Sequence, residues 1–403
     1  MRTSSLKIVF LLMLNAYQRC LASDKWPNHD ISTLKLLQIV HRHGDRAPIS
    51  FPPNDPYQDI KYWREGIGHL NSKGKYRMYK LGEYIRQEYD QYLGDEYSPR
   101  EVYTRSSLSH RCIESVSSLL AGAYPPRNQH WQWGNASDAQ LGTLWQPFPI
   151  ETFMPKRDDI VLRQEKPCPA VYMEKELIYK RPEVQEYLKN KTDLFDRLSA
   201  VVGYPVDSIK KCGQLHTALQ IEMSAGLYWS HVWTRDEQQE IVDQLLDVHR
   251  MAYRLDWDST VIKRLRAGGL VKELTKNFKS VIKGTNDKKL YIYSTHDSML
   301  AALMHGLNIF DGELPLFGST LLLELHQNPG EEQYYVKIYY LRDTYSGVPT
   351  PLPLGDCQNK IDCPLPEFFE STNPLIYHNF KKECKNFINH EKYTYDEKLY
   401  FIR

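Results

Sequence analysis

Hydrophobic residues along this chain fall into short continuous runs that alternate with segments of helical spacing. The runs predict buried strands over 34–40, 101–104, 290–295, 320–325 and 334–341. Between them, Met78, Leu81 and Ile85 follow the helical repeat within 72–94, and a second helix is predicted over 107–124. Strand, helix, strand, helix is the order that builds a sheet covered by helices.

The middle of the chain has a different pattern. From 125 to 180 it is irregular and rich in Pro and Trp, and from 180 to 257 it is helical. We therefore expect a discontinuous α/β domain, formed by 23–124 and 258–403, with a smaller, mainly helical cap domain over 125–257. The predicted fold class is α/β, with a mixed, mostly parallel sheet flanked by helices. In such sheets ligands bind at the carboxyl ends of the strands.

The N-terminus has the pattern of a secretory signal peptide. Arg2 and Lys7 precede the apolar run 8–14, and the small residues Cys20 and Ala22 suit a cut after Ala22. Residues 1–22 are thus predicted to be removed. No other stretch approaches twenty apolar residues, so we expect a secreted product without a membrane anchor, with a lysosomal-type lumen as the other destination open to it.

Composition narrows the class of protein further. The hydrophobic fraction of 41% and the charged fraction of 25% are typical of a soluble globular chain and exclude collagen-like or largely disordered chains. The formal net charge is only +1. An overall balance of this kind gives no attraction to nucleic acid, so any phosphate binding must come from a local cluster of charge.

The cysteines also indicate export. Once the signal peptide is removed, six remain, at positions 112, 168, 212, 357, 363 and 384. Their spacing is not that of a zinc site, and an even number in an exported chain favours three disulfides, although six cysteines allow fifteen pairings. Asn135 and Asn190 begin N-glycosylation sequons, as expected of a protein on this route.

Reactive side chains follow three of the predicted strands, at the edge where strand ends converge. Arg42, His43 and Arg46 follow the first strand, Arg105 follows the second, and His296 and Asp297 follow the strand over 290–295. Arginines present planar, permanently charged forks that match phosphate oxygens. A neutral imidazole can attack phosphorus, and a carboxylic acid can protonate the leaving oxygen. This combination predicts phosphoryl transfer through a phosphohistidine.

Two other classes of function stay open on the residues alone. His41 and His43 alternate along one strand with Asp45 nearby, as metal ligands do in a metallophosphatase. The neighbouring cations Arg42 and Arg46 would repel a divalent metal, so we expect no metal and no cofactor. The second alternative is a catalytically silent binding protein, against which stands the complete set of expected catalytic residues.

These motifs resemble the histidine acid phosphatases, a family that includes prostatic and lysosomal acid phosphatases and phytases. The sequence RHGDRAP at 42–48 and the His-Asp pair within 293–297 carry the resemblance, which extends through 102–106, 124–126, 144–147 and 363–365 and covers roughly 34 to 384. It implies an acid phosphatase for phosphomonoesters and often a homodimer. The roles that it implies are nucleophile for His43, phosphate binding for Arg42, Arg46, Arg105 and His296, and proton donor for Asp297.

The resemblance also implies which cysteines form disulfides with one another. Cys168, Cys357, Cys363 and Cys384 match family positions, whereas the usual partner of Cys212 is replaced near Thr320 and Cys112 is left over. The pairs expected are therefore Cys112–Cys212, Cys168–Cys384 and Cys357–Cys363. Segments similar to the prostatic type favour broad specificity at acidic pH, and a phytase-like inositol phosphate phosphatase is the nearest alternative.

Overall fold

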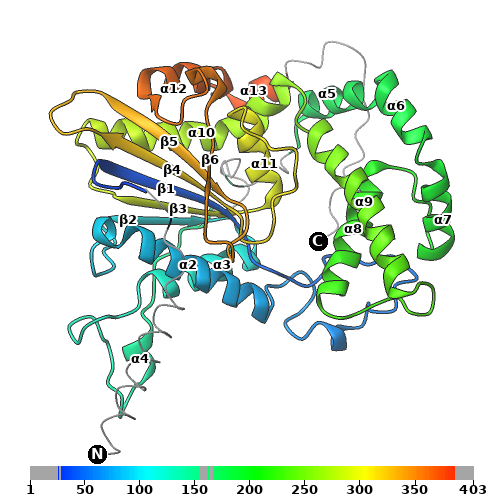
Figure 1. Ribbon diagram of the computed structural model, residues 1–403, viewed down its shortest axis with the longest axis horizontal. Helices are drawn as coiled ribbons and strands as arrows, with labels where there is room; N and C mark the ends of the chain where they lie inside the picture. Colours follow the sequence, from blue (N-terminus) through cyan, green and yellow to red (C-terminus); the bar gives the residue numbers. More distant parts are fainter. Residues whose placement is uncertain (1–25, 27–28, 154–161, 163–166, 386–403) are drawn as a thin grey trace, which may run out of the picture.

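A seven-stranded sheet forms the centre of the protein. The computed structural model describes residues 26, 29–153, 162 and 167–385, so the predicted signal peptide lies outside the described residues. The strand order is β2-β3-β1-β4-β5-β6, with β7 also paired to β5 (Figure 1). The strands are β1 (Leu34–Arg42), β2 (Val102–Ser106), β3 (Leu290–Thr295), β4 (Thr320–Gln327), β5 (Tyr334–Leu341), β6 (Thr350–Pro351) and β7 (Cys363–Pro364).

The sheet has a parallel part and an antiparallel part. β1 and β2 both run parallel to β3, the strand between them, in a register that places Leu37 and Val102 opposite Leu290. β4 is antiparallel to β1, and β5 is antiparallel to β4. The predicted α/β class with a mixed sheet is confirmed. Because β1, β2 and β3 share one direction, their carboxyl ends meet at one edge.

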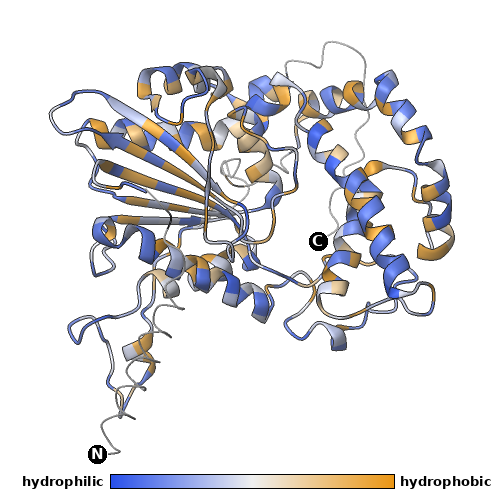
Figure 2. Cartoon of the chain, in the orientation of Figure 1, coloured by the Kyte–Doolittle hydropathy of each residue, from blue (hydrophilic) through white to orange (hydrophobic). Residues whose placement is uncertain are grey.

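Alternating side chains of the strands form two hydrophobic cores, one on each face of the sheet. Leu37 and Ile39 of β1 belong to one cluster, while Leu36 and Val40 belong to the other. A strand buried on both faces therefore reads as a continuous apolar run, which is why β1 could be recognised in the sequence. Figure 2 shows apolar residues along the strands and polar residues along the outer helix surfaces.

Helices cover both faces of the sheet. The helices that cover it are α2 (Ser72–Leu93), α3 (His110–Ala123), α10 (Thr260–Ile282), α11 (Asp297–Gly306), α12 (Leu365–Thr372) and α13 (Phe380–Lys385). α2 and α3 lie on one side of the sheet in Figure 1, and α10, α11 and α12 lie on the other. The α2–α3 contact is close enough that a Cβ on Gly82 would meet the Leu119 carbonyl oxygen at 1.9 Å.

Further helices lie beside the sheet rather than over it, on the right in Figure 1. They are α5 (Pro169–Tyr179), α6 (Pro182–Lys189), α7 (Thr192–Val202), α8 (Ile209–Ser224) and α9 (Arg235–Leu255). α9 begins with a reciprocal capping box between Thr234 and Glu237, which satisfies the backbone N–H groups of its first turn. No helix in the described part of the chain is long and apolar enough to cross a bilayer.

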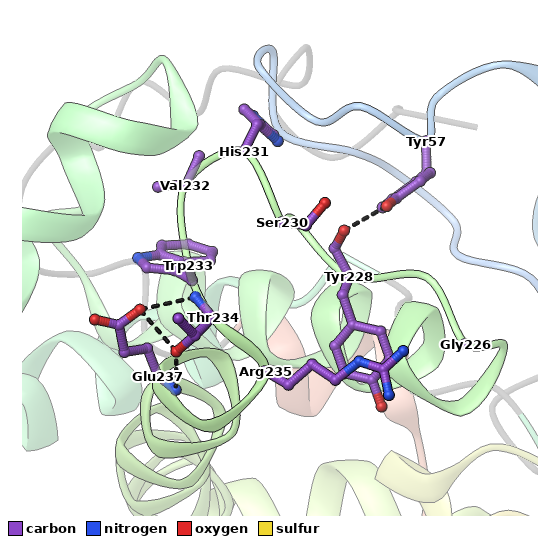
Figure 3. Close-up of a pocket in the computed structure, with 10 residues that line it drawn as sticks. All are labelled: Tyr57, Gly226, Tyr228, Ser230, His231, Val232, Trp233, Thr234, Arg235 and Glu237. Carbon is purple, nitrogen blue, oxygen red and sulfur yellow. Dashed lines mark hydrogen bonds between the residues drawn. The ribbon is translucent and has the colours of Figure 1, made fainter.

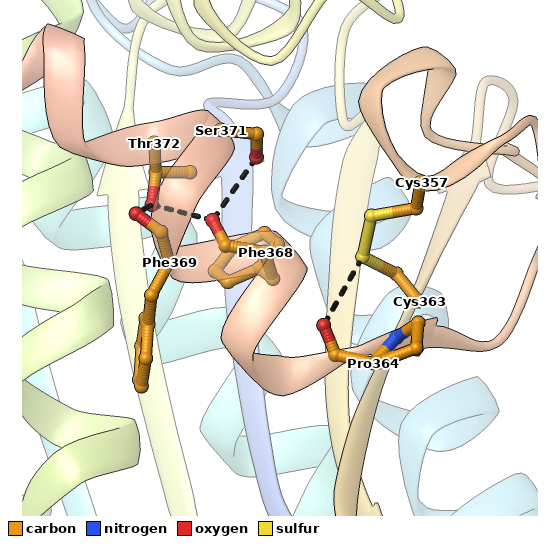
Figure 4. The surroundings of a disulfide bond; sticks show 7 residues. All are labelled: Cys357, Cys363, Pro364, Phe368, Phe369, Ser371 and Thr372. Carbon is orange, nitrogen blue, oxygen red and sulfur yellow. Dashed lines mark hydrogen bonds between the residues drawn. A yellow bond between two sulfur atoms is a disulfide. The ribbon is translucent and has the colours of Figure 1, made fainter.

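Two of the three expected disulfides are present. Cys168 is bonded to Cys384, and Cys357 to Cys363, the latter just before α12 (Figure 4). The long-range pair joins the start of α5 to α13 across a sequence separation of 216 residues. It therefore ties the helices beside the sheet to the C-terminal part of the described chain.

The predicted Cys112–Cys212 disulfide is wrong, since both residues are buried thiols. The reason is their position in the fold. The Cys112 thiol, on α3, lies 3.4 Å from the carbonyl oxygen of Thr295 at the end of β3. Cys212 lies on α8, among the helices beside the sheet, where burial raises the pKa of its thiol to about 12. A thiol that stays protonated is unreactive toward oxidation.

Candidate active site

The carboxyl edge of the parallel strands brings the predicted reactive segments together. Arg42 is the last residue of β1, and the next backbone N–H, of His43, donates to the Thr295 carbonyl at the end of β3 (3.0 Å). On the other side of β3, the Ser107 N–H donates to the Ser294 carbonyl (2.9 Å). The three segments thus leave the sheet side by side.

His43 is held as a neutral imidazole. It is only 2% exposed, and its Nδ1 lies 2.9 Å from the Gly44 carbonyl oxygen. Because a carbonyl can only accept, Nδ1 carries the proton and Nε2 keeps its lone pair. Burial, followed by the nearby charges of Arg111 and Arg42, lowers the pKa of His43 well below its usual value. The ring therefore remains a nucleophile even in acid.

The loop after His43 is held against two helices. The Gly44 N–H donates to the Ser115 hydroxyl of α3 (3.0 Å). A Cβ on Gly44 would meet the Gly74 carbonyl oxygen of α2 at 2.6 Å, and a Cβ on Gly74 would meet the Asp45 carbonyl oxygen at 2.1 Å. Only glycine at both positions permits this approach. The contact fixes the direction in which the His43 ring leaves the backbone.

Arg42 connects the phosphate-binding candidates to the predicted acid. Its Nη2 forms an ion pair with Asp297 Oδ2 (2.6 Å), and its Nη1 donates to the Pro315 carbonyl (2.6 Å). The guanidinium also stacks over the Phe317 ring, 4.0 Å from the centroid. Asp297 accepts from the Ser298 N–H as well (2.7 Å). Burial opposes ionisation of Asp297, but Arg42, His296 and Arg46 lower its pKa to about 2.

Arg46 lies in the same cluster of positive charge. It is 6% exposed and donates through Nη1 to the Ala47 carbonyl (2.9 Å). Burial and the charges of Arg111 and Arg42 lower its pKa to about 9. Among the described residues, the buried Nε–H groups of Arg42, Arg46 and Arg111 find no hydrogen-bond acceptor. Unsatisfied donors and like charges packed together are what a bound anion would stabilise.

The third arginine of the cluster is Arg111, which the sequence reasoning missed. It lies in the first turn of α3, and its Nη2 is 3.4 Å from Nδ1 of His296. Its charge also contributes to the lowered pKa of His43. The opposite end of the same imidazole, Nε2 of His296, contacts the Ser107 hydroxyl (3.0 Å), and the His43 and His296 rings lie 5.5 Å apart.

Arg105 lies at a different position in β2 from the one predicted. It lies within β2 rather than after it, because the strand continues to Ser106. Its guanidinium lies over the Phe153 ring, 4.3 Å from the centroid, with Nη1 3.7 Å from a carboxylate oxygen of Glu273 on α10. These contacts give Arg105 an ion pair with Glu273, and its role in phosphate binding stays a prediction.

One sequence signal could have identified Arg111. Ser109 is the N-cap of α3, so Arg111 falls in the first turn of the helix that follows β2. The first turn after a strand lies at the carboxyl edge, where ligands bind, and its backbone N–H groups favour anions. Arg105 was expected after the strand, whereas it lies within β2, as Arg42 lies within β1.

The metal-binding alternative can be compared with the geometry. Asp45 is held by Arg77, whose Nε donates to it at 2.6 Å, and His41 Nδ1 faces the Arg42 carbonyl (3.1 Å). No group of three or more His, Cys, Asp or Glu side chains that could hold a metal ion occurs in the part of the chain that the structure describes. The donor set around His43 is thus cationic, which suits an anion rather than a divalent metal.

Beyond this cluster, a buried acid pair joins the loop after β1 to α8. Asp55 accepts from the Tyr57 N–H through Oδ1, and Glu222 accepts from the Trp229 indole through Oε2, both at 2.8 Å. The other two oxygens, Asp55 Oδ2 and Glu222 Oε1, are buried and have no other described partner. We therefore infer that the two carboxyl groups share a proton. Tyr57 also donates its hydroxyl to the Tyr228 carbonyl, beside a cavity of about 490 Å³ (Figure 3).

The shared proton predicts one contribution to stability that is present in acid and lost as pH rises. Burial, with Asp55 adjacent, raises the pKa of Glu222 from 4.5 to about 9, so the folded state retains a proton that the unfolded chain releases. This contribution should be lost as pH rises from about 4.5 toward 9. Glu222→Gln, whose amide can donate to Asp55 at any pH, should reduce the loss between pH 5 and 8 by roughly 2 kcal/mol. Denaturant unfolding at both pH values measures this.

Glu186→Gln, at an exposed position on α6, is the matched control for the Glu222 prediction and should leave the wild-type slope unchanged. An equal fall in stability for Glu222→Gln and wild type would contradict the shared proton.

Comparisons with known proteins agree with this fold. Residues 33–341 match the family described as the histidine phosphatase superfamily (branch 2), and the chain belongs to that family. Prostatic acid phosphatase of Rattus norvegicus is 30% identical over 390 residues, which cover 96% of this chain and 97% of the relative. Lysosomal acid phosphatase of the same species is 29% identical over 354 residues, covering 88% and 80%.

Solved structures show the same fold at lower identity. A phytase from Citrobacter braakii superposes with a TM-score of 0.64 at 17% identity, covering 87% of this chain and 98% of its own. A Hafnia alvei phytase in complex with tartrate gives a TM-score of 0.65 at 15% identity, with the same coverage. At this identity the similarity establishes the architecture alone, whereas the curated sequence relatives are acid phosphatases.

Proposed function

We propose that this protein is an acid phosphatase that hydrolyses phosphate monoesters through a covalent phosphohistidine, without a metal ion. One observation carries the proposal. A neutral imidazole, whose Nδ1–H donates to the Gly44 carbonyl, lies within a cluster of the guanidinium groups of Arg42, Arg46 and Arg111, each with a buried Nε–H. The arginines supply fixed positive charge for a phosphoryl group, and the imidazole supplies the nucleophile.

In the first chemical step His43 Nε2 attacks phosphorus. A bond forms between nitrogen and phosphorus while the bond from phosphorus to the ester oxygen breaks, and the alcohol departs with a proton from Asp297. The Nδ1–H continues to donate to the Gly44 carbonyl, and this hydrogen bond stabilises the positive charge that develops on the ring. In the second step water attacks phosphorus, gives a proton back to Asp297, and frees both phosphate and the neutral imidazole.

The source of the Asp297 proton explains why acid should favour turnover. Without substrate, Asp297 is an anion paired with Arg42 at 2.6 Å, and its pKa is about 2. A phosphate monoester loses its second proton near pH 6, so below that pH it brings a proton to the site. Once its oxygens occupy Arg42, that proton is free to pass to Asp297. We therefore expect maximal turnover below neutral pH.

The range of substrates stays broad in this proposal. The curated relatives are prostatic and lysosomal acid phosphatases, which supports turnover of varied small-molecule or peptide monoesters. The solved phytases share the fold and keep inositol phosphates as the second candidate class. The balanced net charge argues against nucleic acid as a partner.

A secreted or lumenal location belongs to the same proposal. Two disulfides require an oxidising compartment, and both sequon asparagines, Asn135 and Asn190, are exposed. For a homodimer, the segment around α4 (Leu141–Leu144) offers a surface, since Trp133, Leu141 and Leu144 are each more than half exposed. Figure 1 shows this segment extending away from the sheet.

Hydrolysis of p-nitrophenyl phosphate by the full mature chain from pH 4 to 9 tests the proposal. We expect a maximum below pH 7, inhibition by vanadate and no effect of EDTA. In the presence of methanol, a product ratio of methyl phosphate to inorganic phosphate that is the same for every aryl ester would show a common covalent intermediate. A maximum above pH 8, or loss of activity with EDTA, would contradict the assignment. Phosphate binding without turnover would indicate a silent binding protein.

A further inference from the structure

The loop between α11 and β4 carries two groups that hold Arg42. The Pro315 carbonyl accepts from Arg42 Nη1 at 2.6 Å, and the same guanidinium lies over the Phe317 ring, 4.0 Å from its centroid. The Phe317 ring also lies 5.8 Å from the His43 ring. The next residue, Gly318, donates its N–H to the His43 carbonyl at 3.1 Å. The path of this loop therefore fixes where the Arg42 guanidinium lies relative to the His43 imidazole.

Glu313 anchors this loop to a helix and to the end of a strand. Its Oε2 accepts from Nε and Nη2 of Arg250, on α9, at 2.9 and 2.7 Å. Nη2 of Arg342, the residue after β5, lies 3.3 Å from the same oxygen. Arg342 Nη1 also pairs with Asp311 Oδ2, and the Glu313 N–H donates to Asp311 Oδ1, both at 3.0 Å. Two arginines from separate elements thus hold the two acidic residues that precede Pro315.

The place of Glu313 in the chain gives its ion pair with Arg250 a consequence for the site. The two side chains are 34% and 35% exposed, and pairs of this kind contribute little to overall stability. Glu313 is, however, only two residues before Pro315, so a shift of its carboxylate is passed to the Pro315 carbonyl by a very short length of backbone. A displacement of about 1 Å in a group that orients a reacting phosphate can cost about 10²-fold in rate.

Resting on the proposed function, we propose that Glu313 is a positioning residue that holds Arg42 in its phosphate-binding orientation through Pro315 and Phe317. Its own described hydrogen bonds and ion pairs are with Arg250, Arg342 and Asp311, so it acts through the loop.

The same ion pair gives the helices beside the sheet a part in the site. Arg250 belongs to α9, one of those helices, and Glu313 belongs to the loop that holds Arg42. The position of α9 therefore contributes to the position of the phosphate-binding guanidinium.

Glu313→Gln tests this inference, since glutamine keeps the size of the side chain and removes its charge. The inhibition constant of inorganic phosphate should rise by about 10-fold, and kcat/KM for p-nitrophenyl phosphate should fall by a similar factor. Arg250→Gln removes the same ion pair from the α9 side and should have the same effect. In an Arg42→Ala background, Glu313→Gln should cause no further change, because a residue that acts through Arg42 has nothing left to position.

Glu383→Gln is the matched control. Glu383 accepts from Nε and Nη2 of Arg264 at 2.7 and 3.3 Å, with similar exposure, but this pair joins α13 to α10. The control should bind phosphate and turn over ester as wild type does. Unchanged phosphate binding in Glu313→Gln, or an undiminished loss in the Arg42→Ala background, would overturn the role of Glu313 and leave the phosphatase assignment intact.

A phosphate titration by calorimetry separates this inference from the proposed function, because it needs no turnover. Wild-type protein that hydrolyses no ester would overturn the proposed function. Weaker phosphate binding in Glu313→Gln than in wild type would then still support the positioning of Arg42, and equal binding would overturn it.

Discussion

Replacing His43 with alanine should lower kcat for every phosphomonoester by about 10⁴-fold or more, because the variant has no atom that can form the covalent intermediate. The described structure explains why no neighbour can substitute. His296, the nearest imidazole at 5.5 Å, faces Arg111 and Ser107 with its two nitrogens. The measurement is steady-state turnover together with alkaline trapping of phosphohistidine from labelled substrate.

The site should otherwise survive the loss of the His43 ring, because the guanidinium groups are held by Pro315, Ala47 and Asp297 rather than by His43. His43→Ala should therefore still bind inorganic phosphate. His41→Ala is the matched control, since His41 is buried in β1, the strand that His43 follows, and contacts only the Arg42 carbonyl among the hydrogen bonds described. It should retain turnover. Loss of activity in both variants would instead favour a metal site that uses both rings.

The parts of the site that the sequence predicted are those where backbone geometry dictates position. His43 follows a strand buried on both faces, and the pair His296 and Asp297 follows another, so the parallel register alone brings them together. The same reasoning gave the mixed sheet. It required only that apolar runs form strands and that parallel strands share an edge.

The parts that were wrong or missed depend on side-chain direction and on tertiary distance. Arg105 was expected after the strand, whereas β2 extends two residues beyond the predicted end and includes it; its role in phosphate binding stays a prediction. The Cys112–Cys212 prediction was wrong because it paired the two cysteines that were left over, without any information on the distance between them. Glu222 gave no signal, since a lone polar residue in a helical pattern has many structural explanations.

The second prediction with a large expected effect compares alanine substitutions at Arg111 and Arg105. Arg111→Ala should lower kcat/KM by about 10²- to 10³-fold, the cost expected for removing one preorganised donor from a developing anion. Arg105→Ala should lower it by less than about 5-fold, because its guanidinium faces Glu273 and Phe153. Both constants come from initial rates with p-nitrophenyl phosphate, alongside the inhibition constant of inorganic phosphate.

Arg111→Lys separates charge from geometry within the same experiment. Lysine keeps the positive charge that lowers the pKa of His43 but lacks the planar fork, so activity should recover only in part. Phosphate inhibition should weaken in Arg111→Ala and stay near wild type in Arg105→Ala. If Arg105→Ala were instead the more damaging substitution, the phosphate would have to bind closer to β2. The position of Arg111 in the first turn of α3, next to His296, argues that it does not.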